Sequence, residues 1–142
     1  MMINKTTATK KERNRKWYFY DASGKVLGML AADIAKILIG KNNADYAPNQ
    51  NTGGIVVVTN AEKIALTGTK MKTKTYMHHT GYPKGLRETK IQKVYDNNPA
   101  QILERAIKGM LPKNKLHAER MKNLHVYVGP EHPHKAQEEK GK

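Results

Sequence analysis

The sequence has 142 residues, no cysteine, and 26 lysines and arginines against 12 acidic residues, which gives a net charge of +14. This length predicts one domain, and the lack of cysteine excludes disulfides and thiolate chemistry. Such an excess of positive charge favours a polyanionic partner, nucleic acid before an anionic membrane surface. No apolar run approaches the roughly 18 residues of a membrane span, and none follows the N-terminus as in a secretory signal. We therefore expect a cytoplasmic protein without a membrane partner.

Residues 1–16 carry a single acid, Glu12, and six cations. Because this segment has few apolar side chains to bury, it is predicted to be a flexible basic arm. A merely solvated tail and a short organellar presequence remain as alternatives. Residues 17–142 are predicted to form a single α/β domain, with an irregular C-terminal tail from about residue 130.

The segment from Trp17 to Gly40 is predicted to be the centre of the fold. Residues 17–20 are an aromatic run typical of a strand, and a turn with Asp, Ser and Gly follows. Residues 26–39 predict a helix that Gly40 ends in a left-handed conformation. Apolar residues cover most of this helix apart from a narrow outer stripe of Met29, Asp33 and Lys36, so it should be largely buried. A strand that leads into such a helix is the first half of a βαβ unit.

The next elements extend this unit. Residues 41–54 are rich in Asn, Gly and Pro and predict a long loop. Residues 55–58 are continuously apolar and β-branched, which is typical of a parallel strand covered on both faces. Residues 61–66 predict a turn or a short helix. Lysines then alternate with other residues over 69–75, and a strand here would place Lys70, Lys72 and Lys74 on one side.

The second half of the sequence predicts helices and one more strand. Thr89 is the expected N-cap of a short helix. Asn98 and Pro99 are a start signal for the next helix, whose apolar residues keep a helical spacing until Pro112 ends it. Residues 113–123 are basic and weakly helical, and residues 124–128 alternate as a last strand.

Several short motifs in this chain are weak alone but specific in their order and spacing. They are Trp17-Tyr18 with Asp21–Gly28, Thr52-Gly53, Asn60–Lys63, Tyr76–Gly81, Ala106–Lys113, and Val126-Tyr127 with Gly129. In this arrangement the chain resembles the bacterial type of the large-subunit ribosomal protein thirteen family, from about residue 17 to residue 134.

The resemblance implies a three-layer α/β/α fold around a mainly parallel four-stranded sheet. It also implies large-subunit rRNA and neighbouring large-subunit ribosomal proteins as partners, and an early role in subunit assembly. Two departures from the family pattern leave the RNA contacts expected at those places open. Met29 stands where the family usually has Arg, and Leu116-His117-Ala118 stands where it often has Leu-Gly-Arg.

The residues themselves show no catalytic constellation. Neither the G-x-G-x-x-G fingerprint nor a Walker A motif occurs, and Ser23, the single serine, lies outside any G-x-S-x-G motif. The alternative hypothesis is a metal site formed by His78, His79, His132 and His134. Adjacent residues of a strand point to opposite faces, however, and no cysteine supports these histidines. We expect no enzyme, no cofactor, no metal and no small-molecule substrate.

RNA is favoured over DNA because the cations are dispersed and no helix-turn-helix or zinc pattern appears. Dispersed cations on an α/β body suit contact with several backbones of a folded RNA. The candidate RNA-binding residues are Lys10, Lys11, Arg13, Arg15, Lys70, Lys72, Lys74, His78, His79, Lys84, Arg87, Lys108, Lys113, Lys115, Arg120 and Lys122.

Overall fold

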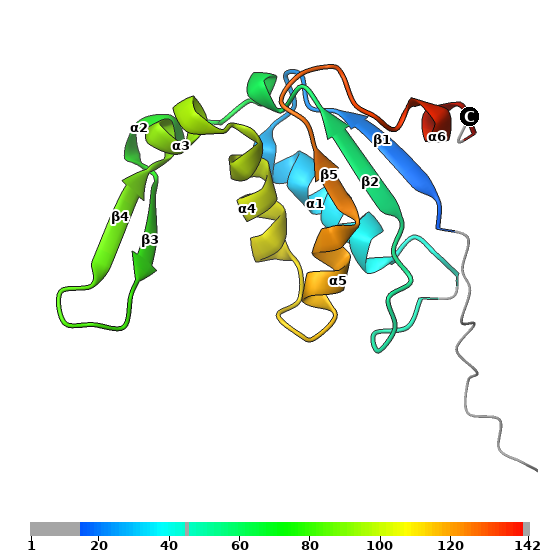
Figure 1. Ribbon diagram of the computed structural model, residues 1–142, viewed down its shortest axis with the longest axis horizontal. Helices are drawn as coiled ribbons and strands as arrows, with labels where there is room; N and C mark the ends of the chain where they lie inside the picture. The colour runs from blue at the N-terminus through cyan, green and yellow to red at the C-terminus, as the bar shows by residue number, and fades with distance from the viewer. Residues whose placement is uncertain (1–14, 45, 141–142) are drawn as a thin grey trace, which may run out of the picture.

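The computed structural model describes residues 15–44 and 46–140. The predicted class, mixed α/β with a parallel sheet, is confirmed (Figure 1). In chain order the elements are β1 (Trp17–Asp21), α1 (Leu27–Ile39), β2 (Ile55–Thr59), η1 (Ala61–Lys63), α2 (Lys70–Thr73), β3 (Thr75–His79), β4 (Leu86–Lys90), α3 (Ile91–Asn97), α4 (Ala100–Met110), α5 (His117–Lys122), β5 (Leu124–Val126) and α6 (Lys135–Lys140).

A parallel sheet in the order β1-β2-β5 forms the centre of the fold. It has three strands within the described residues, where four were predicted. Tyr18, Val56 and Leu124 lie side by side in one row across the sheet. Residues 56–58 of β2 are each 0% exposed, which confirms the prediction of a strand covered on both faces.

The helix α1 confirms the predicted helix to within one residue. Gly40 adopts φ 87°, and its N–H donates to the carbonyl oxygens of Lys36 and Ile37, both at 3.0 Å. A left-handed glycine at this position satisfies carbonyl groups that the helix end leaves free. Asp33 and Lys36 form an exposed ion pair at 3.4 Å, and Met29 is 71% exposed. The predicted outer stripe is therefore correct.

The helix α4 packs against α1 and completes the core on this face of the sheet. Ile34 of α1 and Leu103 and Ile107 of α4 are each 0% exposed. Burying such a side chain stabilises a fold by about 1.5–3 kcal/mol, so the contact between α4 and α1 contributes to the stability of the protein. Asn98 Oδ1 accepts a hydrogen bond from the N–H of Ala100 at 3.1 Å, which confirms Asn98 as part of the helix start.

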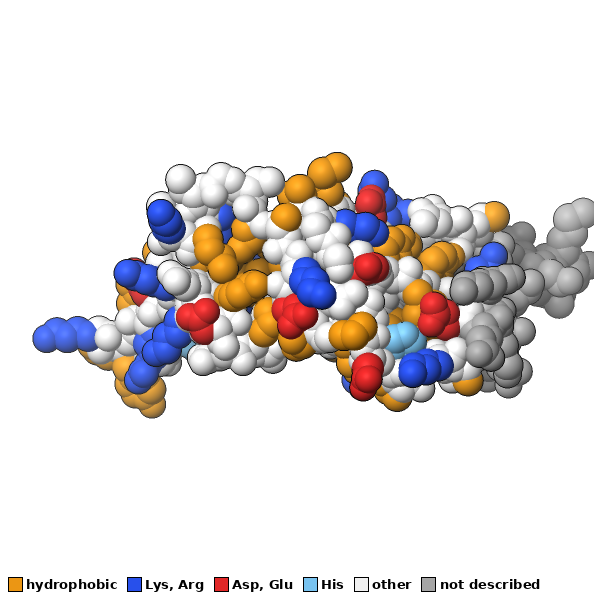
Figure 2. Space-filling view, turned by 90° about the horizontal axis from the view of Figure 1, so that it is seen from above, with side chains coloured by type: hydrophobic (Ala, Val, Ile, Leu, Met, Phe, Trp, Pro, Cys, Tyr) orange, Lys and Arg blue, Asp and Glu red, His pale blue; other side chains and the backbone are white. Residues whose placement is uncertain are grey.

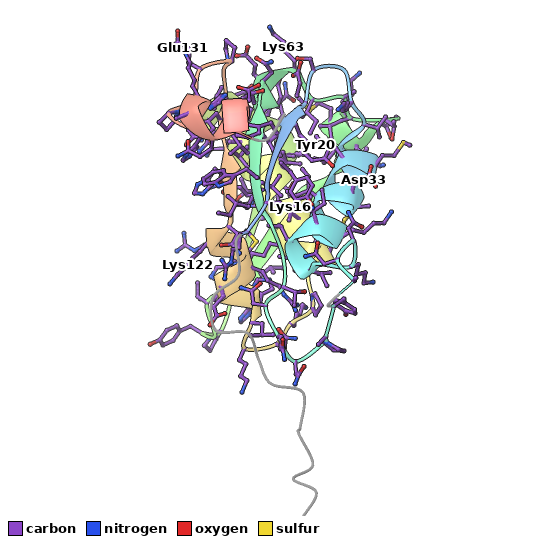
Figure 3. All side chains as sticks on the ribbon, turned by 90° about the vertical axis from the view of Figure 1, so that its right-hand side faces the viewer. Lys16, Tyr20, Asp33, Lys63, Lys122 and Glu131 are labelled. Atoms are coloured by element: carbon purple, nitrogen blue, oxygen red, sulfur yellow. The ribbon has the colours of Figure 1, made fainter. Side chains whose placement is uncertain are left out.

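The C-terminal tail covers the other face of the sheet, where α6 packs against β1. Figure 3 shows α1 and α6 on opposite sides of the strands. Ring centroids are 5.1 Å apart for Trp17 and His134, 5.6 Å for Phe19 and His132, and 4.9 Å for His125 and His134. These rings hold the tail against the sheet. Residues 135–140 then form α6, where an irregular tail was predicted.

The segment 69–90 differs most from the prediction. The lysines that alternate over 69–75 do not lie along a strand, because α2 is a single helical turn in which the N–H of Lys74 donates to the carbonyl of Lys70 at 3.0 Å. The strands β3 and β4 form an antiparallel hairpin that projects from the body (Figure 1). Thr89 lies within β4 and caps no helix, since α3 begins at Ile91 after Lys90. Among the described helices, none has the length and apolar character needed to cross a bilayer.

Candidate nucleic-acid interface

The predicted RNA-binding residues gather mainly in two groups, and every described one except Arg120 is exposed. The first, the hairpin group, consists of Lys70, Lys72, Lys74, His78, His79, Lys84 and Arg87. The second, the α4–α5 group, consists of Lys108, Lys113, Lys115 and Lys122. Lys10, Lys11 and Arg13 lie outside the described residues.

The hairpin group has the strongest excess of positive charge. From residue 67 to residue 90 the chain has six cations and a single acid, Glu88. Figure 2 shows lysine and arginine side chains at the end of the molecule that the hairpin forms, and more of the acidic side chains toward its middle. A projecting element with this charge balance can reach backbone phosphates without moving the body of the protein.

The hairpin presents different side chains on its two faces. His78 lies opposite Arg87 and on the same face as Tyr76, whereas His79 lies opposite Leu86 on the other face. The N–H of Gly81 donates to His79 Nδ1 at 2.9 Å, so in the neutral ring the proton is on Nε2. The exposed N–H groups of His78, His79 and Arg87 can donate to phosphate oxygens or to ribose hydroxyls.

Tyr76 joins the hairpin to α4. The Arg105 guanidinium lies 4.6 Å from the centroid of the Tyr76 ring, and Lys74 Nζ lies 5.5 Å from it. Burial raises the pKa of the Tyr76 hydroxyl, although the charge of Arg105 opposes this. The ring therefore stays neutral, and the two cations are held beside it by cation–π attraction.

A pocket of about 530 Å³ lies between the end of α4 and the start of α5. It is lined by Arg105, Lys108, Gly109, Lys113, Asn114 and His117. His117 Nε2 donates to the carbonyl oxygen of Lys108 at 3.2 Å, which fixes α5 against α4. Asn114 Oδ1 accepts from the N–H of Leu116 at 3.1 Å, which holds the turn before α5. Two predicted residues, Lys108 and Lys113, are brought together at this pocket.

The prediction for Arg120 is wrong. Its side chain is only 1% exposed, so it is a buried part of α5 and is not available to bind RNA. The sequence of residues 113–123 does not predict this burial, because an arginine in a basic, weakly amphipathic segment is expected to lie at the surface. Arg15 is exposed, and its Nη1 donates to Asn123 Oδ1 at 2.8 Å. Arg15 thus holds the start of β1 near the end of α5.

Sequence reasoning missed Arg105, Asn114 and His117. Arg105 lies three residues before Lys108 and so on nearly the same side of α4, a spacing that could have linked them. Asn114 and His117 gave no such signal, because they reach the pocket only through the reversal of the chain between α4 and α5.

The structure adds no catalytic or metal-binding constellation in the described part of the chain. No group of three possible metal ligands occurs there. Asp21 has a pKa lowered to about 2, chiefly by the hydrogen bond from Asn60 Nδ2 and then by those from the backbone N–H and Oγ of Ser23. These bonds hold the turn after β1 and keep the carboxylate ionised, which is unsuited to a general acid.

An α/β body with a cationic hairpin and a cation-lined pocket is typical of the class of basic proteins that bind polyanions. The comparison with known families agrees with this class and narrows it. The family model described as ribosomal protein L13 matches residues 15–133. This chain therefore belongs to the ribosomal protein L13 family, which confirms the resemblance seen in the motifs. The family consists of structural ribosomal proteins and not of enzymes.

Bacterial relatives match nearly the whole chain. The large ribosomal subunit protein uL13 of Legionella pneumophila (strain Corby) is 52% identical over 129 residues, which cover 91% of this chain and 90% of the relative. The protein of the same name from Geobacter sulfurreducens is 50% identical over 138 residues, 96% of each chain. That of Thermoanaerobacter sp. (strain X514) is 51% identical over 130 residues, 92% of this chain and 91% of the relative.

Proposed function

We propose that this protein is a structural constituent of the large ribosomal subunit that binds large-subunit rRNA and supports early subunit assembly. Its partners are the rRNA and neighbouring large-subunit ribosomal proteins, and it works in the cytoplasm. Membership of the L13 family supports the assignment to the large subunit, because the relatives are named as proteins of the large ribosomal subunit. We also propose that the protein has the three-layer α/β/α arrangement that the family resemblance implies.

The observation that carries rRNA binding is the hairpin group. Lys84 and Arg87 are exposed on the hairpin that projects from the body, and Lys70, Lys72 and Lys74 are exposed in and just after α2, which directly precedes it. Glu88 is the single acid between residues 67 and 90. The helix of this group, α2, is only four residues long, so the expected contacts are to phosphate and sugar. The α4–α5 group provides a second contact region, and the basic arm of residues 1–16 a third.

The test is a triple variant, Lys70→Gln, Lys72→Gln and Lys74→Gln, assayed for binding to in vitro transcribed large-subunit rRNA. Each lost phosphate contact should make the slope of log K against log salt less negative by about 0.7–0.9. Because all three side chains are exposed, each substitution should change the free energy of unfolding by no more than about 0.5 kcal/mol.

A matched control removes the same charge elsewhere. Lys25, Lys36 and Lys63 are also exposed but lie outside both groups, so their triple Gln variant has the same net charge. We expect the hairpin variant to bind rRNA more weakly than this control and to enter the large subunit less efficiently in cells. Equal losses in the two variants would show that only net charge matters and that Lys70, Lys72 and Lys74 are not the contact.

A further inference from the structure

An open, shallow pocket lies in the basic surface between α4 and α5. Its volume of about 530 Å³ lies within the range of roughly 300–1,000 Å³ typical of pockets that bind small molecules. The His117 bond to Lys108 and the Asn114 bond to Leu116 hold its wall in place. A preformed wall loses little conformational freedom when a ligand binds.

Gly109 lines this pocket. It lies in the last turn of α4, and a Cβ built on it would meet no atom within 4 Å. Glycine is a poor helix former, so its presence inside a helix usually reflects a need for space or for unusual backbone angles. Here it leaves free the volume that any larger side chain would enter.

The lining indicates the chemistry of the ligand. Arg105, Lys108 and Lys113 contribute three cations, and none of the six lining residues is acidic. Carbon atoms nevertheless form most of the inner surface, since long cationic side chains lay their methylene stems along a wall and keep their charged ends outside. A bare phosphate would use only the cationic rim. A ligand that uses both the rim and the interior has a flat, weakly polar part and a negative charge, as a nucleotide has.

We propose that this pocket receives one unstacked nucleotide of the bound RNA. The base lies between Arg105 and His117, and its flanking phosphates contact Lys108 and Lys113. Guanidinium and imidazole groups are common stacking partners of splayed bases, and Arg105 is already oriented by the Tyr76 ring at 4.6 Å. This proposal rests on the rRNA binding proposed above. It adds that the protein selects an unpaired nucleotide as well as a backbone shape.

The test fills the pocket with a side chain. Gly109→Leu places a good helix former where the structure has free space, so the variant should fold and melt no lower than wild type. Both proteins are bound to in vitro transcribed large-subunit rRNA, and base-specific chemical probing maps the protected unpaired bases. We expect wild type to protect at least one such base and Gly109→Leu to lose that protection with roughly tenfold weaker binding, as for a lost stacking contact.

Gly28→Leu is the matched control. Gly28 is exposed in α1, lies outside the pocket, and likewise has no atom within 4 Å of a built Cβ. This variant should keep the affinity and the protected bases of wild type. Should Gly109→Leu fail to fold, the double variant Lys108→Gln and Lys113→Gln replaces it, with the same loss expected.

The outcomes separate the two proposals. If wild type binds large-subunit rRNA no better than an unrelated RNA of equal length, the proposed function fails. If wild type binds specifically while the folded pocket variant protects the same bases with the same affinity, the pocket proposal is wrong and rRNA binding stands. The pocket proposal is also wrong if Gly28→Leu and Gly109→Leu weaken binding equally.

Discussion

Replacing Arg120 by Met should make this protein more stable without weakening its binding to rRNA. The Arg120 side chain is only 1% exposed, and its Nε has no hydrogen-bond partner within the described residues. A buried polar group without a partner costs about 1–3 kcal/mol. Exchanging buried charged groups for apolar ones of similar volume is often neutral or stabilising, by up to about 4 kcal/mol. We expect a gain of about 1–3 kcal/mol in the free energy of unfolding.

The gain converts into a measurable shift of the melting temperature. The entropy of unfolding is roughly 2.1 cal/mol/K per residue, so 142 residues give about 0.3 kcal/mol/K in total. A gain of about 1–3 kcal/mol then raises the melting temperature by about 3–10 °C, which calorimetry resolves. Filter binding to rRNA gives the second readout. A lower melting temperature, or a loss of rRNA affinity in a folded Arg120→Met variant, would refute the reasoning that this cation is buried and poorly paired.

Two further predictions concern the core and the C-terminal tail. Leu103→Ala should cost about 2–5 kcal/mol by urea denaturation, because Leu103 is 0% exposed between α4 and α1. A cost below about 1 kcal/mol would contradict this packing. Burial and the charge of His134 lower the pKa of His125. The unfolded chain therefore takes up the proton more readily below about pH 6.5. Stability should thus fall between about pH 7.5 and pH 5, and His125→Phe should reduce that fall. An equal fall in this variant would show that His125 is not the titrating group.

The first half of the fold was predictable because burial imposes a period on the residues. The helix α1 and the strand β2 are apolar wherever the structure buries them, and Gly40 ends α1 for a conformational reason that is visible in the sequence. The helix α4 shows the same principle, since its apolar residues follow the face that meets α1. In these elements local pattern and tertiary contact agree.

The hairpin could not be predicted because its residues are mostly exposed. With little burial to impose a period, Lys70–Lys74 alternates like a strand yet forms a helical turn. The strands of the hairpin are stabilised by each other and by Tyr76, which packs on the core and carries Arg105 over its ring. Hydrophobic periodicity does not predict contacts of this kind, between two exposed strands or between a tyrosine ring and an arginine.

The candidate site was predictable in its charge but not in its shape. The exposed lysines of both groups follow from the excess of basic residues, whereas the pocket depends on a chain reversal that brings His117 back to Lys108. The burial of Arg120 likewise depends on how α5 is seated, which its own sequence does not specify.

The position of β5 at an edge of the parallel sheet affects the order in which the chain folds. β1 and β2 can pair once residues 17–59 are available, whereas β5 must return to β2 across residues 60–123. Contacts that close so long a loop form slowly, and synthesis from the N-terminus delays them further. Because α5 directly precedes β5, the last wall of the pocket is completed in this same late step. A nascent chain therefore presents its cationic hairpin before its pocket is complete.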